Sequence, residues 1–99
     1  MQKVFQVFND PGHGWVKVPL TLLMKLGIID KITTYSYMRG EFAYLEEDCD
    51  ASTFFNAMKA KGIEPEWRST TANKLSKIRG YASYSPSRAW QALGMAVAR

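Results

Sequence analysis

Residues 32–50 read ITTYSYMRGEFAYLEEDCD, and Arg39-Gly40 lies there between two runs rich in aromatic and β-branched residues. This pattern predicts a β-hairpin with Arg39-Gly40 as its two-residue loop. Side chains alternate between the faces of a strand, so the loop also determines which residues face each other. Two aromatic pairs then lie on one face of the hairpin: Tyr37 opposite Phe42, and Tyr35 opposite Tyr44.

The residues before this hairpin predict a strand, a turn, a second strand and a helix. Alternation favours a strand over residues 2–8, and residues 15–18 can return beside it. Between them, residues 9–12 read NDPG, in which the proline and glycine are typical of a type II turn. Pro19 is suited to the first position of a helix over residues 20–26, which Gly27 would end.

The residues after the hairpin predict a longer helix over 51–61. Its apolar side chains are spaced i, i+3, i+4 and i+7, at Ala51, Phe54, Phe55 and Met58. Asp50 or Asp48 would cap its start, and Gly62 would end it.

The C-terminal third contains weaker patterns. Residues 63–69 alternate, but Pro65 has no N–H to donate, so this segment is predicted as an edge strand. Residues 70–84 have no clean period and are predicted as an irregular basic segment. Ser85-Pro86 provides an N-cap followed by proline, which predicts a short helix that continues to about Ala98.

The 99 residues are enough for one domain with a modest core. The element order predicts a small single α+β domain. It has an antiparallel sheet of about four to five strands, two helices on one face and a short C-terminal helix. We expect residues 1–69 to form the core domain, and residues 70–99 to pack on it or extend from it.

Composition restricts the environment and the class of partner. One cysteine excludes an internal disulfide, and the apolar runs are far shorter than the ~20 residues of a membrane span, so we expect a cytoplasmic protein that does not enter a membrane. The formal net charge of +4 is uneven: −4 over residues 46–66 and +6 over residues 67–99. Such separation favours a macromolecular partner, or pairing between the two segments.

One candidate site combines the first turn with the acidic run. His13 is flanked by glycines that let a backbone approach a ligand closely, and residues 46–50 hold four carboxylates. If the fold brings the two segments together, they form one polar site for a ligand or a hard cation. Helix capping and pairing with the basic tail are the alternatives. The candidate binding residues are Asp10, His13, Trp15, Glu46, Glu47, Asp48 and Asp50.

No catalytic signature is found in this set, and we expect neither a cofactor nor a resident metal. A nucleophile–base pair between Cys49 and His13 requires a geometry that the sequence does not indicate, and Cys49 is expected to be buried instead. A zinc site made only of cysteine and histidine is excluded within one chain, which has one residue of each type.

A second candidate site is a surface for nucleic acid. Basic groups neutralise phosphates, and aromatic rings stack on unpaired bases. The two aromatic pairs of the hairpin, which we call the aromatic ladder, are suited to such stacking. The alternative is that the helix over 51–61 packs on these rings. The candidate contact residues in the basic third are Arg68, Lys74, Lys77, Arg79, Tyr81 and Tyr84.

Four segments together resemble a family of small proteins encoded by bacteriophages, plasmids and some bacterial genomes. They are DPGHGW at 10–15, LGI at 26–28, YSY at 35–37 and YLEEDCD at 44–50. The resemblance covers residues 8–62 and implies a phage or mobile-element origin, with the host cytoplasm as the compartment. Small phage proteins commonly bind host defence complexes, remodel host enzymes or coat nucleic acid.

Three functions are compatible with these residues. The first is a non-enzymatic binding protein that acts on a host protein or nucleoprotein complex, such as a defence complex, with the acidic run mimicking phosphates. The second is direct binding of nucleic acid through the basic C-terminal third and the aromatic ladder. The third is a small-molecule or metal-dependent activity around His13 and the acidic run.

Overall fold

The structure is a computed structural model that describes residues 1–94. It contains a six-stranded sheet in the order β5-β1-β2-β4-β3-β6. The bounds of the strands are β1 Val4–Asn9, β2 Gly14–Pro19, β3 Tyr37–Arg39, β4 Phe42–Glu46, β5 Glu66–Thr71 and β6 Ala82–Ser83. The helices are α1 Leu20–Lys25, α2 Asp50–Ala60 and α3 Pro86–Ala92, with 3-10 helices η1 Ile29–Lys31 and η2 Lys77–Gly80. Residues 95–99, which include the predicted end of the last helix, lie outside the description.

The α+β class is confirmed, but the sheet is mixed and has more strands than predicted. Strand β5 runs parallel to β1, whereas the other neighbours are antiparallel. The parallel pair arises because α2 carries the chain back between β4 and β5, as parallel pairing requires. The sixth strand, β6, spans two residues, which is too short to show an alternating pattern.

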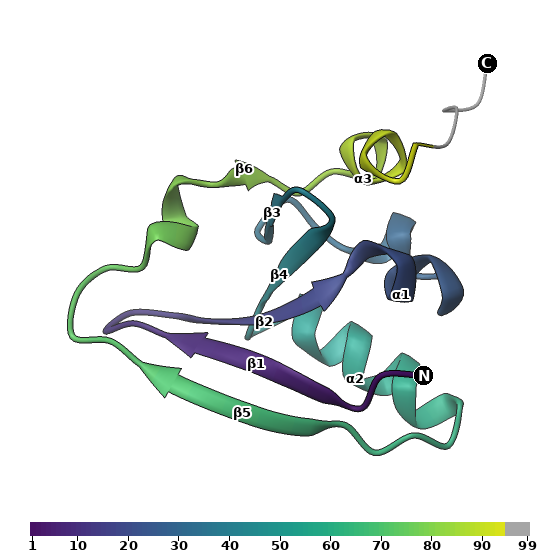
Figure 1. Cartoon of the computed structure of the whole chain (residues 1–99), viewed down its shortest axis with the longest axis horizontal. Coiled ribbons are helices and arrows are strands. Elements are labelled where there is room, and N and C mark those ends of the chain that lie inside the picture. The colour runs from purple at the N-terminus through teal and green to yellow at the C-terminus, as the bar shows by residue number, and fades with distance from the viewer. Residues whose placement is uncertain (95–99) are drawn as a thin grey trace.

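The main core lies between one face of the sheet and the helices. Phe54 and Met58 of α2 are completely buried there, together with Val18 and Leu45 of the sheet. Leu20 of α1 and Ala89 of α3 belong to the same cluster. Figure 1 shows β5, β1 and β2 side by side, with α2 next to them. The helix predicted over 51–61 is thus confirmed, and Phe54 and Met58 of its apolar spacing are core residues.

The central hairpin forms, but its register is two residues away from the prediction. Arg39 pairs with Phe42 and Tyr37 with Tyr44, so the loop is Gly40-Glu41 and not Arg39-Gly40. Gly40 has a φ of 60°, which suits glycine at the first central position of a two-residue hairpin loop. A shift of two residues keeps each side chain on its predicted face. Tyr35 lies before the strand and is 74% exposed.

Two local predictions are corrected. The turn at residues 10–13 is not type II, because Gly12 does not have the positive φ that this turn requires. The Asp10 carboxylate instead accepts hydrogen bonds from the backbone N–H groups of Gly12 and His13, each at 3.0 Å. Cys49 is exposed, since it lies in the turn before α2 and not inside the helix.

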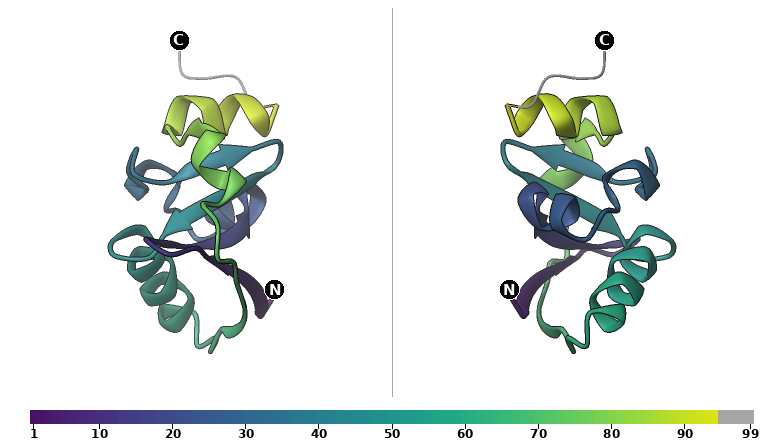
Figure 2. Two further views of the ribbon diagram at one scale, coloured as in Figure 1. Left: turned by 90° about the vertical axis from the view of Figure 1, so that its left-hand side faces the viewer. Right: turned by 90° about the vertical axis from the view of Figure 1, so that its right-hand side faces the viewer.

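The basic segment crosses the face of the sheet that the main core leaves free. Strands β5 and β6 lie at opposite edges, so the chain between them, residues 72–81, has to pass over the sheet. We call residues 72–81 the strap, and Figure 2 shows it in green in front of the strands. Ile78 in the strap is buried against Trp15 and Tyr44. The alternative in which α2 covers the aromatic ladder is therefore wrong, because α2 packs on the other face.

In the part of the chain that the structure describes, none of the helices has the length and apolar character needed to cross a membrane.

Candidate nucleic-acid interface

The second face of the sheet carries a cluster of aromatic rings, which we call the aromatic face. Trp15 and Tyr44 are buried in it, while Phe8, Tyr37 and Tyr81 are half-buried. The Tyr44 ring centroid lies 5.1 Å from that of Tyr81 and 6.4 Å from that of Phe8. Burial raises the pKa of the Tyr44 hydroxyl, with a further contribution from the neighbouring Tyr81.

Cations lie over several rings of this face. Lys17 Nζ is 4.3 Å from the ring centroid of Phe42, and the Arg39 guanidinium is 5.2 Å from that of Tyr81. Phe42 is 36% exposed and Arg39 is exposed, so this pairing occurs at the surface. A surface that mixes rings and cations matches both the bases and the phosphates of an unpaired strand.

The strap is held to the β1–β2 loop by one carboxylate. Asp10 accepts hydrogen bonds from Arg79 Nε at 2.7 Å and Arg79 Nη2 at 2.9 Å, and from the backbone N–H of Ser76 at 2.9 Å. Hydrogen bonding to Arg79, with added backbone donors, holds the pKa of Asp10 well below its usual range, although burial opposes this. The Arg79 guanidinium also lies 5.4 Å from the Trp15 ring centroid.

A cleft of about 330 Å³ opens between the strap and the ends of β1 and β5, and we call it the strap cleft. Its lining includes the aromatic residue Phe8, the basic residues Lys74 and Lys77, and the hydroxyl-bearing residues Thr70 and Ser76. Both lysines are exposed, and no carboxylate lines this cleft within residues 1–94. Such a lining is suited to a phosphate and an adjoining ring.

The structure separates the nucleic-acid candidates of the basic third. Arg68, Lys74 and Lys77 are exposed, and the strand register places Arg68 on the same face as Phe8. Arg79 is engaged by Asp10, and Tyr81 packs on Tyr44.

Tyr84 differs from the other candidates because it is completely buried and does not reach the surface. Its hydroxyl donates a hydrogen bond of 2.7 Å to the carbonyl of Ile29, so it serves the core and is not available to a base. Sequence reasoning missed Phe8 and Lys17 at the interface. The alternation of β1 and β2 was the signal that could have placed both residues on one face.

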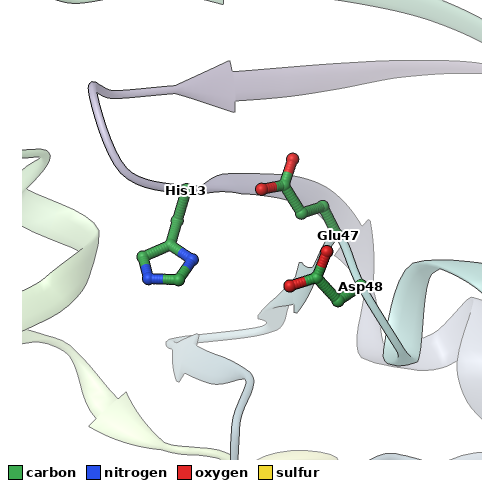
Figure 3. A group of neighbouring side chains, drawn as sticks. All are labelled: His13, Glu47 and Asp48. Atoms are coloured by element: carbon green, nitrogen blue, oxygen red, sulfur yellow. The ribbon is translucent and has the colours of Figure 1, made fainter.

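The polar site predicted from the first turn and the acidic run assembles in part. His13, Glu47 and Asp48 come together, as Figure 3 shows, and the side chains of all three are exposed. Glu46 and His13 also line a pocket of about 190 Å³ with Trp15 and Arg79. The Trp15 side chain is buried, and it contributes a wall of this pocket.

Asp50 does not belong to this site. Its carboxylate is completely buried and accepts hydrogen bonds from the Thr33 backbone and hydroxyl, and from the Ser36 hydroxyl. It does not cap α2 through its side chain, contrary to the prediction. Instead, the backbone N–H of Cys49 donates a hydrogen bond of 2.8 Å to Glu46 Oε1. The acidic run is therefore divided. Asp50 is buried and Glu46 makes a local hydrogen bond, whereas Glu47 and Asp48 are exposed.

A further groove of about 470 Å³ lies between α2 and the sheet. Phe55, Trp67 and Val7 make it largely apolar, and its polar groups come from serine and asparagine. Among the residues that the structure describes, no cation lines this groove, so it does not match a phosphate backbone and we assign it no ligand.

No protein-family model, curated protein or solved structure matches this chain.

Proposed function

We propose that this protein is a non-enzymatic binding protein that contacts single-stranded nucleic acid through the strap cleft and the aromatic face. The observation that carries this proposal is the lining of the strap cleft, to which Lys74, Lys77 and Phe8 all contribute. Arg68 and Lys17 continue the positive charge along the same face. Phosphate neutralisation and base stacking together are the general means by which proteins hold unpaired strands.

The shape of the surface favours an unpaired strand over a duplex. A cleft of about 330 Å³ beside half-buried rings can admit a base that has left its stack. Bases inside a duplex present only their edges, so their faces are not available to a ring such as Phe8.

The positions of the carboxylates in the acidic run argue against phosphate mimicry. Asp50 is internal and Glu46 binds its own loop, whereas Glu47 and Asp48 are the exposed carboxylates of the run. Two carboxylates do not reproduce the extended charge of a phosphate backbone. Action on a host defence complex, and a phage or mobile-element origin, remain predictions of the sequence resemblance.

The salt dependence of binding tests the proposal. We expect a labelled single-stranded oligonucleotide to bind the parent protein, with log K falling linearly as log salt concentration rises. Replacing Lys74 and Lys77 by alanine removes two phosphate contacts. The slope should then become shallower by about 1.4, since each contact contributes about 0.7 for single strands. Fluorescence anisotropy at several salt concentrations provides this measurement.

The matched control is the Lys25→Ala, Lys31→Ala variant. It removes the same charge from exposed positions in α1 and η1, outside the strap cleft. This control should keep the parent slope within error. No binding by the parent, or equal slopes for the two double variants, would contradict the proposed interface.

A further inference from the structure

The fold brings three potential metal ligands together from two loops that are distant in sequence. His13 lies in the β1–β2 loop, and Glu47 and Asp48 lie in the turn between β4 and α2. One ligand atom from each residue can be chosen so that all of them lie within 4.8 Å of one another. In Figure 3 the two carboxylates and the imidazole lie on neighbouring segments.

The donor set fits a borderline transition metal better than calcium or magnesium. Imidazole nitrogen suits zinc, copper, iron and nickel, whereas Ca²⁺ and Mg²⁺ select oxygen ligands. Zinc binds histidine nitrogen at about 2.0–2.1 Å and carboxylate oxygen at about 2.0–2.2 Å, so two ligands of one tetrahedral ion are roughly 3.4 Å apart. The present ligand atoms lie within 4.8 Å of one another, and because all three side chains are exposed, rotation about their bonds can bring these atoms to the shorter spacing.

The backbone segments that carry the three metal ligands are held in place by hydrogen bonds before any ion binds. The Asp10 N–H donates to the His13 carbonyl at 2.9 Å, and the His13 N–H donates to Asp10 Oδ1 at 3.0 Å. The Glu47 N–H donates a hydrogen bond to the Gly14 carbonyl at 3.1 Å. This bond joins the segment that carries Glu47 and Asp48 to the segment that carries His13. Rigid support of this kind lowers the ordering cost of binding.

Gly14 contributes the space into which one ligand folds. A Cβ atom at this position would lie 2.8 Å from Glu47 Oε2 and 2.5 Å from Asn9 Oδ1. Both separations are shorter than side chains tolerate, so a larger residue would displace the Glu47 carboxylate. Glycine at position 14 therefore permits Glu47 to approach the loop that holds His13.

We propose that His13, Glu47 and Asp48 form a binding site for a divalent transition-metal ion of the zinc class. The chain supplies three ligands, and the remaining coordination positions are open to water or to an anionic ligand. This site lies outside the strap cleft, and it does not depend on the proposed nucleic-acid function.

Isothermal titration of the tag-free, chelator-treated protein with ZnCl₂ tests this site. One ion should bind per chain, and His13→Gln should weaken that binding at least about tenfold, because even supporting residues of metal sites contribute 10–100-fold. Glu47→Gln with Asp48→Asn should have a similar effect. The matched control, Glu64→Gln with Glu66→Gln, removes two exposed carboxylates at a distance in the sequence and should bind as the parent does.

A second measurement needs no variant. His13 is the single histidine of the chain, so its imidazole NMR signals can be assigned without ambiguity. Stoichiometric Zn²⁺ should shift these signals in the folded parent. Absence of heat and of any shift would overturn the proposal. A zinc affinity that survives His13→Gln but is lost in Cys49→Ser would also overturn it, since the ion would then use the exposed thiol.

Discussion

At the scale of single residues, Asp10 joins two parts of the chain that are far apart in sequence. Its side chain is fully buried, and its carboxylate bonds the guanidinium of Arg79 together with backbone groups on both sides. Because the ionised form receives all these donors, folding favours the charged carboxylate. The pKa of Asp10 in the folded protein is therefore far below the ordinary value of about 3.9.

The depressed pKa predicts how stability depends on pH. The contribution of ionised Asp10 is fully present above the unfolded pKa of about 3.9, and it is lost as the pH falls through the lower folded pKa. Asp10→Asn lacks this contribution at every pH. We expect the difference in unfolding free energy between parent and variant to be largest at neutral pH and to narrow below about pH 4.

Urea unfolding of both proteins at pH 7 and at several values below pH 4 measures this difference. Glu64→Gln is a suitable control, because Glu64 is exposed. A gap between parent and Asp10→Asn that stays constant over the whole range would show that the Arg79 pair does not depend on the charge of Asp10.

At the scale of elements, α2 supplies the helical side of the main core. Phe54 is completely buried and meets the Phe5 ring edge-on, with centroids 5.0 Å apart. Its neighbour Phe55 is half-buried at the groove and lies 6.0 Å from the Trp67 ring. These two phenylalanines are adjacent in α2 and have the same helix propensity, but only Phe54 is completely buried.

Replacing Phe54 by alanine should lower the free energy of unfolding by about 3–5 kcal/mol, because the change leaves a cavity in a packed core. Phe55→Ala should cost clearly less, since solvent and small side-chain movements can fill its place. Thermal and urea unfolding measure both values. Equal losses for the two variants would mean that α2 is rotated relative to the arrangement described above.

At the scale of the whole molecule, the C-terminal third belongs to the same packed unit as the first strands. Tyr84 is completely buried, and its hydroxyl donates to the Ile29 carbonyl at 2.7 Å. Ala89 of α3 lies in the main core, while Ile78 of the strap closes the aromatic face. Within residues 1–94, two apolar clusters are found, one on each face of the sheet.

Tyr84→Phe should destabilise the protein by about 1–3 kcal/mol, because it leaves a buried carbonyl without this donor. Tyr35→Phe, at a residue that is 74% exposed, should change stability by less than about 0.5 kcal/mol. Urea unfolding followed by circular dichroism compares them. If Tyr84→Phe matched Tyr35→Phe, the segment after the strap would not be docked as described.

Much of the local structure could be predicted from sequence because short-range chemistry decides it. The spacing of Ala51, Phe54, Phe55 and Met58 predicted α2, and Ser85-Pro86 predicted the start of α3. Glycines at 27 and 62, both with positive φ, end the helices they were expected to end. The hairpin register was missed because glycine can take either central position of a two-residue loop, and only pairing along the whole strand decides between them.

The sequence by itself determined the α+β class, the helix over 51–61, the edge position of β5 and the separation of charge along the chain. Tertiary structure alone decided which face of the sheet each segment covers. The strap crosses the aromatic face because β5 and β6 lie at opposite edges, and Asp50 is buried because Thr33 and Ser36 surround it. His13 meets Glu47 and Asp48 because β2 pairs with β4, which places the β1–β2 loop beside the end of β4. Contacts between different elements depend on how the strands are ordered and packed, which local propensity does not encode.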